Sequence, residues 1–206
     1  MNKLGKNIMS DKIIKNGSLE VICGPMFSGK SEELMRRLRR ASIAKQQVIT
    51  FKPSIDNRYE IEFVVSHDGT KHKAQALSSP EKIYDLVEQT KAMVIGIDEA
   101  QFFSQDIIAI ICSLIAHEKR VIIAGLDLDF RGVPFNVMPI LMAIADSVTK
   151  LRAICTQCGN DAHFTQRLVN GNPAHYDDPI ILIGAQESYQ ARCRNCYSID
   201  KQPQWR

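Results

Sequence analysis

The sequence has no apolar run long enough to cross a membrane. Its longest strongly apolar stretch, residues 107–116, spans ten residues between charged neighbours, whereas a membrane-spanning helix needs about 20. A secretory signal is missing too, because polar side chains interrupt the apolar ones throughout the first residues. We therefore expect a protein that stays in the cytosol.

A strong excess of one charge is also missing. The 26 Lys and Arg residues nearly balance the 23 Asp and Glu residues, which leaves a formal net charge of +3. This small excess disfavours a scaffold that binds nucleic acid or a membrane surface. Gly and Pro number only 11 and 8 among 206 residues, and hydrophobic residues make up 45%, which excludes a disordered or fibrous chain. The length suits one domain with a small appendage.

From residue 18 onward, short apolar runs alternate with segments of helical periodicity. This alternation predicts an α/β fold, in which helices connect the strands of a parallel sheet over residues 17–152. Residues 1–16 lack any such pattern and are expected to form a flexible arm. Helix 107–118 is apolar on most faces, so it is expected to pack on the sheet or on a partner subunit. The expected strands are 19–23, 48–51, 94–98, 121–125 and 147–154, and the expected helices are 31–44, 80–89 and 107–118.

The segment between the first strand and the first helix matches the phosphate-binding pattern G-x-x-x-x-G-K-[ST]. Such a P-loop turns backbone N–H groups toward the phosphates of a nucleotide, and the next helix adds the positive end of its dipole. Lys30 is expected to reach the β- and γ-phosphates, and Ser31 to bind Mg²⁺. The expected ATP-binding residues of this loop are Gly24, Pro25, Met26, Phe27, Ser28, Gly29, Lys30 and Ser31.

Two adjacent carboxylates, Asp98 and Glu99, end another apolar run. P-loop enzymes place an acidic partner for the metal at the end of a neighbouring strand, so Asp98 is expected on the magnesium side of the ATP site. Glu99 is then left as a general base, which can take a proton from a substrate hydroxyl in a kinase or orient water in an ATPase. The motif by itself does not decide between these reactions. Ala100 and Gln101 complete this acidic segment of the expected ATP site.

Four of the six cysteines form two C-x-x-C pairs. In a reducing compartment this pattern favours a metal site over disulfides, and four thiolates satisfy tetrahedral Zn²⁺ without leaving a position open for catalysis. The spacer of 34 residues between the pairs predicts a loop held at its base by the metal, which suits a lid over an active site. This zinc-binding lid is expected at 153–198, followed by a tail at 199–206. The expected zinc ligands are Cys155, Cys158, Cys193 and Cys196.

Several segments, in order along residues 17–198, together resemble the type II (cellular-type) thymidine kinases. The resemblance implies transfer of the ATP γ-phosphoryl group to the 5′-hydroxyl of thymidine, which yields thymidine monophosphate and ADP. Besides the P-loop and the cysteine pairs, the segments are Asp56-Asn57-Arg58-Tyr59, Ser66-His67-Asp68-Gly69, Asp98-Glu99-Ala100-Gln101-Phe102-Phe103 and Gly125-Leu126-Asp127-Leu128-Asp129-Phe130-Arg131-Gly132-Val133-Pro134-Phe135.

The resemblance also implies roles for individual residues. Glu99 falls on the family's catalytic base, and Arg58 on an arginine that stabilises charge at the transferring phosphate. Phe130 matches an aromatic residue that packs on thymine. A lasso loop of the family folds over the base and reads it largely through backbone groups. The implied substrate-binding residues are Met26, Asp56, Phe102, Leu126, Phe130, Thr165, Leu182, Gly184 and Tyr189.

The resemblance further implies a homotetramer and feedback inhibition by thymidine triphosphate. From the residues alone, two other functions stay open. One is a nucleic-acid-dependent P-loop ATPase with a zinc ribbon, which the acidic segment 98–101 and the arginines of the first helix suggest, although the chain is short for two motor domains. The other is a non-enzymatic zinc-ribbon binding module, in which the P-loop would be unused.

Overall fold

A six-stranded sheet forms the centre of the computed structural model, which describes residues 17–54, 63–65, 71–180 and 187–201. The strand order is β5-β2-β6-β7-β1-β8, and all five pairings are parallel, which confirms the α/β prediction. The strands are β1 (Ser18–Cys23), β2 (Val48–Pro53), β5 (Gln75–Leu77), β6 (Val94–Ile97), β7 (Arg120–Gly125) and β8 (Ser147–Lys150).

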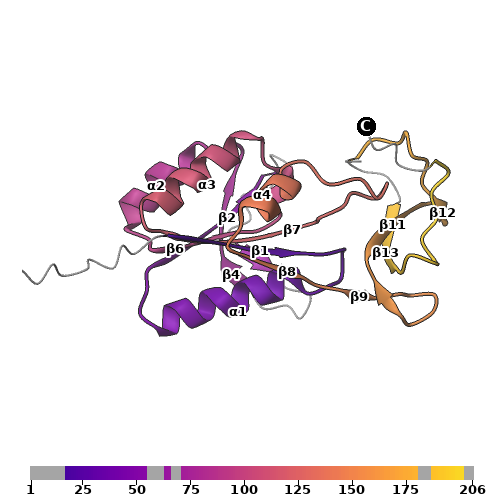
Figure 1. Ribbon diagram of the computed structural model, residues 1–206, viewed down its shortest axis with the longest axis horizontal. Coiled ribbons are helices and arrows are strands. Elements are labelled where there is room, and N and C mark those ends of the chain that lie inside the picture. Colours follow the sequence, from indigo (N-terminus) through magenta and orange to yellow (C-terminus); the bar gives the residue numbers. More distant parts are fainter. Residues whose placement is uncertain (1–16, 55–62, 66–70, 181–186, 202–206) are drawn as a thin grey trace, which may run out of the picture.

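Helices cover both faces of this sheet (Figure 1). On one face, Leu34 and Leu38 of α1 pack with Ile22 of β1. On the other face, α2, α3 and α4 pack in the core cluster that contains the neighbouring residue Val21, because successive side chains of a strand point to opposite faces. Strands buried on both sides read as continuous apolar runs, which is why the sequence predicted them. The helices are α1 (Lys30–Ile43), α2 (Lys82–Thr90), α3 (Asp106–Ala116) and α4 (Met138–Ile144).

Helix α3 buries one face against the sheet, which answers the question that its apolar sequence left open. Ile107, Ile111 and Leu114 are fully buried in the main core. The apolar residues Ile108 and Ile110 on the other faces are only partly buried. The packing of α3 therefore uses the three-to-four spacing of an amphipathic helix, although its sequence is apolar nearly all round.

The expected strand 147–154 is wrong in its extent. The structure divides it into β8, which pairs with β1, and β9 (Ala153–Ile154), which pairs with β10 (Asp161–Ala162) in a separate sheet. Leu151 lies at the division, and its backbone N–H still donates to the carbonyl of Cys23 at 2.7 Å. The chain leaves the main sheet directly after this bond. Strand β5, with three residues, and α4, with seven, are too short to produce a clear periodic pattern and were not predicted.

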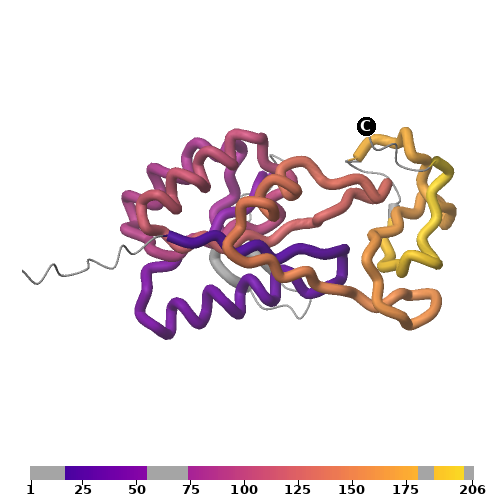
Figure 2. Tube along the Cα trace, in the orientation of Figure 1, coloured from indigo at the N-terminus to yellow at the C-terminus, as the bar shows by residue number. Residues whose placement is uncertain are grey.

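The part of the chain after Leu151 forms a smaller unit beside the end of the main sheet (Figures 1 and 2). We call its described residues, 152–180 and 187–201, the C-terminal unit. Its larger sheet is antiparallel, with the order β12-β11-β13. These strands are β11 (Phe164–Val169), β12 (Asn172–Pro173) and β13 (Glu187–Arg192). Earlier in the chain, outside the C-terminal unit, β3 (Phe63–Val65) and β4 (Lys71–Lys73) form a separate antiparallel pair.

Some predictions fall outside the described residues. They concern the N-terminal arm at 1–16 and four site residues, Asp56, Arg58, Leu182 and Gly184. These remain predictions, as do the domain boundaries. None of the helices in the described ranges combines the length and apolarity that crossing a membrane would require.

Candidate active site

Three central strands deliver the expected functional residues to one edge of the sheet. The P-loop follows β1, Asp98 follows β6, and Leu126 follows β7, and these strands are adjacent in the order β6-β7-β1. Because the strands are parallel, their carboxyl ends meet at the same edge, which is where open α/β sheets bind ligands.

The P-loop depends on two glycines with positive φ angles. Gly24 has φ 144°, and Gly29, which caps α1, has φ 80°. A Cβ atom on Gly24 would lie 2.5 Å from the carbonyl oxygen of Leu151, so the loop needs glycine there for space as well as for conformation. Lys30 is nearly buried, and its Nζ donates to the carbonyl of Pro25 at 2.7 Å across the loop.

Gly24→Ala is expected to raise the KM for ATP by about tenfold or more, a factor that corresponds to 1.4 kcal/mol. The added methyl group would displace the loop from Leu151 and move its N–H groups away from the phosphates. Gly171→Ala is the matched control, because Gly171 also has a positive φ, of 80°, but a Cβ there meets nothing within 4 Å. Steady-state kinetics with varied ATP measure the effect, and an unchanged KM for ATP in Gly24→Ala would contradict this account of the loop.

Asp98 and Ser31 form a donor set that suits Mg²⁺. The Ser31 hydroxyl donates to Asp98 Oδ2 at 2.9 Å, and the backbone N–H of Glu99 donates to Asp98 Oδ1 at 3.0 Å. Burial and the neighbouring Glu99 carboxylate raise the pKa of Asp98 to about 7, against the opposing effect of these hydrogen bonds and of Lys30. Hard oxygen ligands beside the P-loop fit a magnesium ion, whose positive charge would stabilise the ionised Asp98.

Glu99 lies just beyond the carboxyl end of β6, where its backbone and side chain are both constrained. Its backbone is left-handed, with φ 52°, directly before a 3₁₀ turn at Ala100–Phe102. Its carboxylate accepts a hydrogen bond from Gln101 Nε2, while Gln101 Oε1 accepts one from the backbone N–H of Leu126 at 3.0 Å. Gln101 is almost fully buried. In the described structure, Gln101 therefore fixes Glu99 relative to the end of β7.

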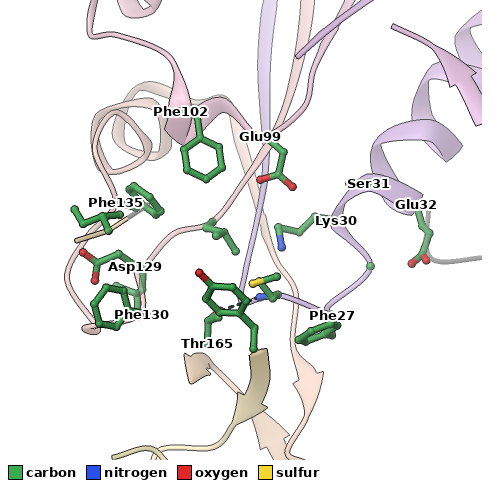
Figure 3. A pocket seen from close by; sticks show the side chains of 16 residues that line it. Phe27, Lys30, Ser31, Glu32, Glu99, Phe102, Asp129, Phe130, Phe135 and Thr165 are labelled. Atoms are coloured by element: carbon green, nitrogen blue, oxygen red, sulfur yellow. Dashed lines mark hydrogen bonds between the residues drawn. The ribbon is translucent and has the colours of Figure 1, made fainter. Parts of the chain in front are cut away.

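Lys30 and Glu99 face each other across the site (Figure 3). Burial lowers the pKa of Lys30, whereas the nearby carboxylates of Glu99, Asp98 and Asp127 act in the opposite direction. The site thus joins a buried cation suited to phosphate with a carboxylate suited to accept a proton.

A cavity of about 640 Å³ lies at this edge, between the P-loop and the C-terminal unit. It brings together Glu99, Lys30 and six of the expected substrate-binding residues, and the aromatic rings of Phe102, Phe130 and Phe135 lie on one side of it (Figure 3). The six are Met26, Phe102, Leu126, Phe130, Thr165 and Tyr189.

Five further lining residues were not predicted as site residues. Phe135 contacts Phe102 edge-on, with ring centroids 5.6 Å apart, so it extends the aromatic side of the cavity. The signal for Phe135 was present, because it ends the segment 125–135 that carries the family resemblance. The five residues are Glu32, Leu128, Asp129, Phe135 and Ile180.

One hydrogen bond connects the P-loop directly to the C-terminal unit. The backbone N–H of Met26 donates to Thr165 Oγ1 of β11 at 3.0 Å, and Thr165 is 4% exposed. The dashed line in Figure 3 marks this contact. The P-loop and the C-terminal unit are therefore in direct contact where they line the cavity.

A comparison with known protein families agrees with this arrangement. A sequence model described as thymidine kinase matches residues 17–197. The chain belongs to the thymidine kinase family. It is accordingly an ATP-dependent kinase that phosphorylates thymidine, which confirms the function implied by the motif resemblance over the ATPase alternative.

In the folded kinase, the four cysteines of the two C-x-x-C motifs form one cluster. The Sγ atoms of Cys155, Cys158, Cys193 and Cys196 all lie within 4.8 Å of one another, and those of Cys158 and Cys193 are 3.6 Å apart. A tetrahedral zinc site with bonds of about 2.3 Å places its sulfur atoms about 3.8 Å apart, so the cluster fits Zn²⁺. Burial opposes ionisation of Cys155, but hydrogen bonds from the backbone outweigh it and lower the pKa of this thiol to about 6.

The cysteine cluster of the kinase is linked to the cavity by Tyr197, which follows Cys196. The Tyr197 ring stacks on Phe164 at a centroid distance of 4.5 Å, and its hydroxyl donates to the carbonyl of Phe130 at 2.6 Å. Burial raises the pKa of Tyr197, so the phenol remains a hydrogen-bond donor at neutral pH. A metal held by the cysteines would therefore help to position an aromatic wall of this cavity.

Proposed function

We propose that this kinase transfers the γ-phosphoryl group of ATP to the 5′-hydroxyl of thymidine with Glu99 as the general base. Glu99 takes the proton of the hydroxyl, the freed oxygen forms a bond to the γ-phosphorus, and the bond to the β–γ bridging oxygen breaks, which releases ADP. The observation that carries this proposal is the position of Glu99 in the same cavity as Lys30 and Phe130. The base thus lies between a phosphate-binding group and an aromatic wall suited to a nucleobase.

In this proposal, the P-loop N–H groups and Lys30 hold the ATP phosphates. Ser31 and Asp98 would hold Mg²⁺, which supplies positive charge to the phosphate oxygens. Arg58 would stabilise the transferring group, and Asp56, Leu182 and Gly184 would contact thymidine, as the family resemblance implies.

The aromatic wall would bind the thymine ring by stacking, and the remaining lining residues would enclose it. Met26, Leu126 and Tyr189 line the same cavity as Phe130 and support this assignment. Backbone donors and acceptors of the lasso loop suit the imide edge of thymine, whereas the amino group of cytosine would meet a donor where it needs an acceptor.

The family resemblance also supports a structural Zn²⁺, a homotetramer in the cytoplasm, and feedback inhibition by thymidine triphosphate. Exposed apolar side chains on α4 and on the edge strand β8 are compatible with self-association. Ile140 and Ile144 of α4 and Val148 of β8 are each between 43% and 45% exposed.

Incubation of the purified protein with γ-radiolabelled ATP and separate nucleosides tests the proposed reaction. We expect labelled thymidine monophosphate with thymidine, and much less product with deoxycytidine or deoxyadenosine. ADP release that requires added DNA, with no labelled nucleoside monophosphate, would instead support the ATPase and overturn the proposal.

A further inference from the structure

Arg167 of β11 has an unusual environment for a charged side chain. Its exposed fraction is 0%, and it is the largest fully buried side chain among the described residues. Removing a guanidinium group from water is unfavourable unless its surroundings compensate for the lost hydration. The contacts of Arg167 therefore indicate what its charge contributes.

The Arg167 guanidinium contacts two walls of the nucleoside cavity that come from distant parts of the chain. It lies over the ring of Phe130, 5.0 Å from the ring centroid, in a cation–π arrangement. Its Nη1 atom also donates to the carbonyl oxygen of Pro179 at 2.6 Å. Phe130 follows the core strand β7, whereas Pro179 directly precedes the cavity residue Ile180.

The sheet of the C-terminal unit places Arg167 on the face that forms the cavity. Arg167 pairs with Tyr189 across β11 and β13, and Thr165 lies two residues earlier on the same strand. Opposite residues of an antiparallel pair, and alternate residues of one strand, share a face. Thr165 and Tyr189 line the cavity. Because Arg167 has no exposed surface, it acts on the walls rather than on a ligand.

We propose that Arg167 is a positioning residue for nucleoside binding, which holds the Phe130 ring and the Pro179–Ile180 backbone in fixed relation to each other. Arginine suits this task because its planar group stacks on a ring while donating hydrogen bonds within its own plane, whereas lysine carries a compact charge without a flat face. The assignment rests on the proposed function, in which Phe130 packs on thymine. Loss of Arg167 would loosen the thymidine site and leave the P-loop contacts with ATP in place.

Arg167→Lys and Arg167→Met test this role through separate KM values for the two substrates. We expect the KM for thymidine to rise about tenfold in Arg167→Met and less in Arg167→Lys, with the KM for ATP changed less than about twofold in both. The zinc content and melting temperature establish that each variant is folded. If Arg167→Met does not fold, Arg167→Lys decides the question.

Arg152→Met is the control, because Arg152 is an exposed arginine of the C-terminal unit that pairs with Asp161 at 2.6 Å and does not line the cavity. It should keep the wild-type KM for thymidine. A double-mutant cycle adds Phe130→Leu. If Arg167 acts through the ring, the fold-increase in the KM for thymidine of the double variant should be well below the product of the fold-increases of the two single variants.

Two outcomes would overturn the proposal. One is a folded Arg167→Lys or Arg167→Met protein with a wild-type KM for thymidine, and the other is a parallel rise of both KM values, which would indicate general loosening. Failure of the wild-type protein to phosphorylate thymidine would be a different result, because it would contradict the proposed function before any variant is compared.

Discussion

Glu99→Gln is expected to lower kcat for thymidine phosphorylation by about 10²- to 10⁴-fold, the range in which general-base catalysis contributes. Glutamine has nearly the shape of glutamate and can still accept the hydrogen bond from Gln101 through its amide oxygen, so the loop should keep its conformation. Under the proposed mechanism, the substitution removes the group that takes the proton of the 5′-hydroxyl. Steady-state kinetics, together with direct measurement of ATP and thymidine binding, separate this loss from a loss of affinity.

Glu88→Gln is a suitable control for the Glu99 experiment. Glu88 lies on α2, is 54% exposed, and pairs with Lys119 at 3.7 Å away from the cavity. Its replacement removes one carboxylate and should leave kcat unchanged. A folded Glu99→Gln protein with wild-type kcat and normal binding of both substrates would exclude Glu99 as the base.

If the four cysteines bind Zn²⁺ as proposed, Cys155→Ser should remove the metal and raise the KM for thymidine by about 100-fold or more. A structural zinc ion contributes roughly 10 kcal/mol or more to the folding of the segment that binds it, so its loss should unfold the cysteine cluster. Tyr197 would then no longer hold the carbonyl of Phe130, and Thr165 would no longer meet Met26. Metal analysis, thymidine kinetics and circular dichroism measure these changes.

A cysteine outside the cluster provides the control for the Cys155 experiment. Cys112 is an exposed cysteine of α3. Cys112→Ser should keep both zinc and activity, because Cys112 lies outside the cluster of four sulfur atoms. Full thymidine activity in a zinc-free Cys155→Ser protein would contradict the link between the metal site and the cavity.

The fold was predictable where one pattern covers a whole element. Buried parallel strands such as β6 and β7 read as nearly continuous apolar runs, and α1 shows its buried stripe at three-to-four spacing. The break between β8 and β9 was not predictable in this way. Residues 147–150 form an edge strand whose side chains are largely exposed, so hydrophobicity does not mark where the chain changes sheets.

The candidate site was predictable where its chemistry depends on neighbours in the sequence. The P-loop and the cysteine pairs have fixed local spacing, and the carboxylates of Asp98 and Glu99 directly follow a strand. Arg167 and Tyr197 have no such signal, because their contacts join residues far apart in the chain. A charged residue in a short strand is normally expected at the surface, and only the tertiary structure places Arg167 inside.

The pairing of β1 has a consequence for how the chain folds during synthesis. β1 leads into the P-loop, yet its two sheet neighbours are β7 and β8, since Ser18 pairs with Arg120 and Glu20 pairs with Ser147. A nascent chain that ends before Arg120 contains the complete phosphate-binding motif but neither strand that borders β1. Such distant pairings slow folding, because a long loop must close before its contacts form. Nucleotide-binding ability should therefore arise late, and release of the chain before β7 would leave an apolar strand open to aggregation.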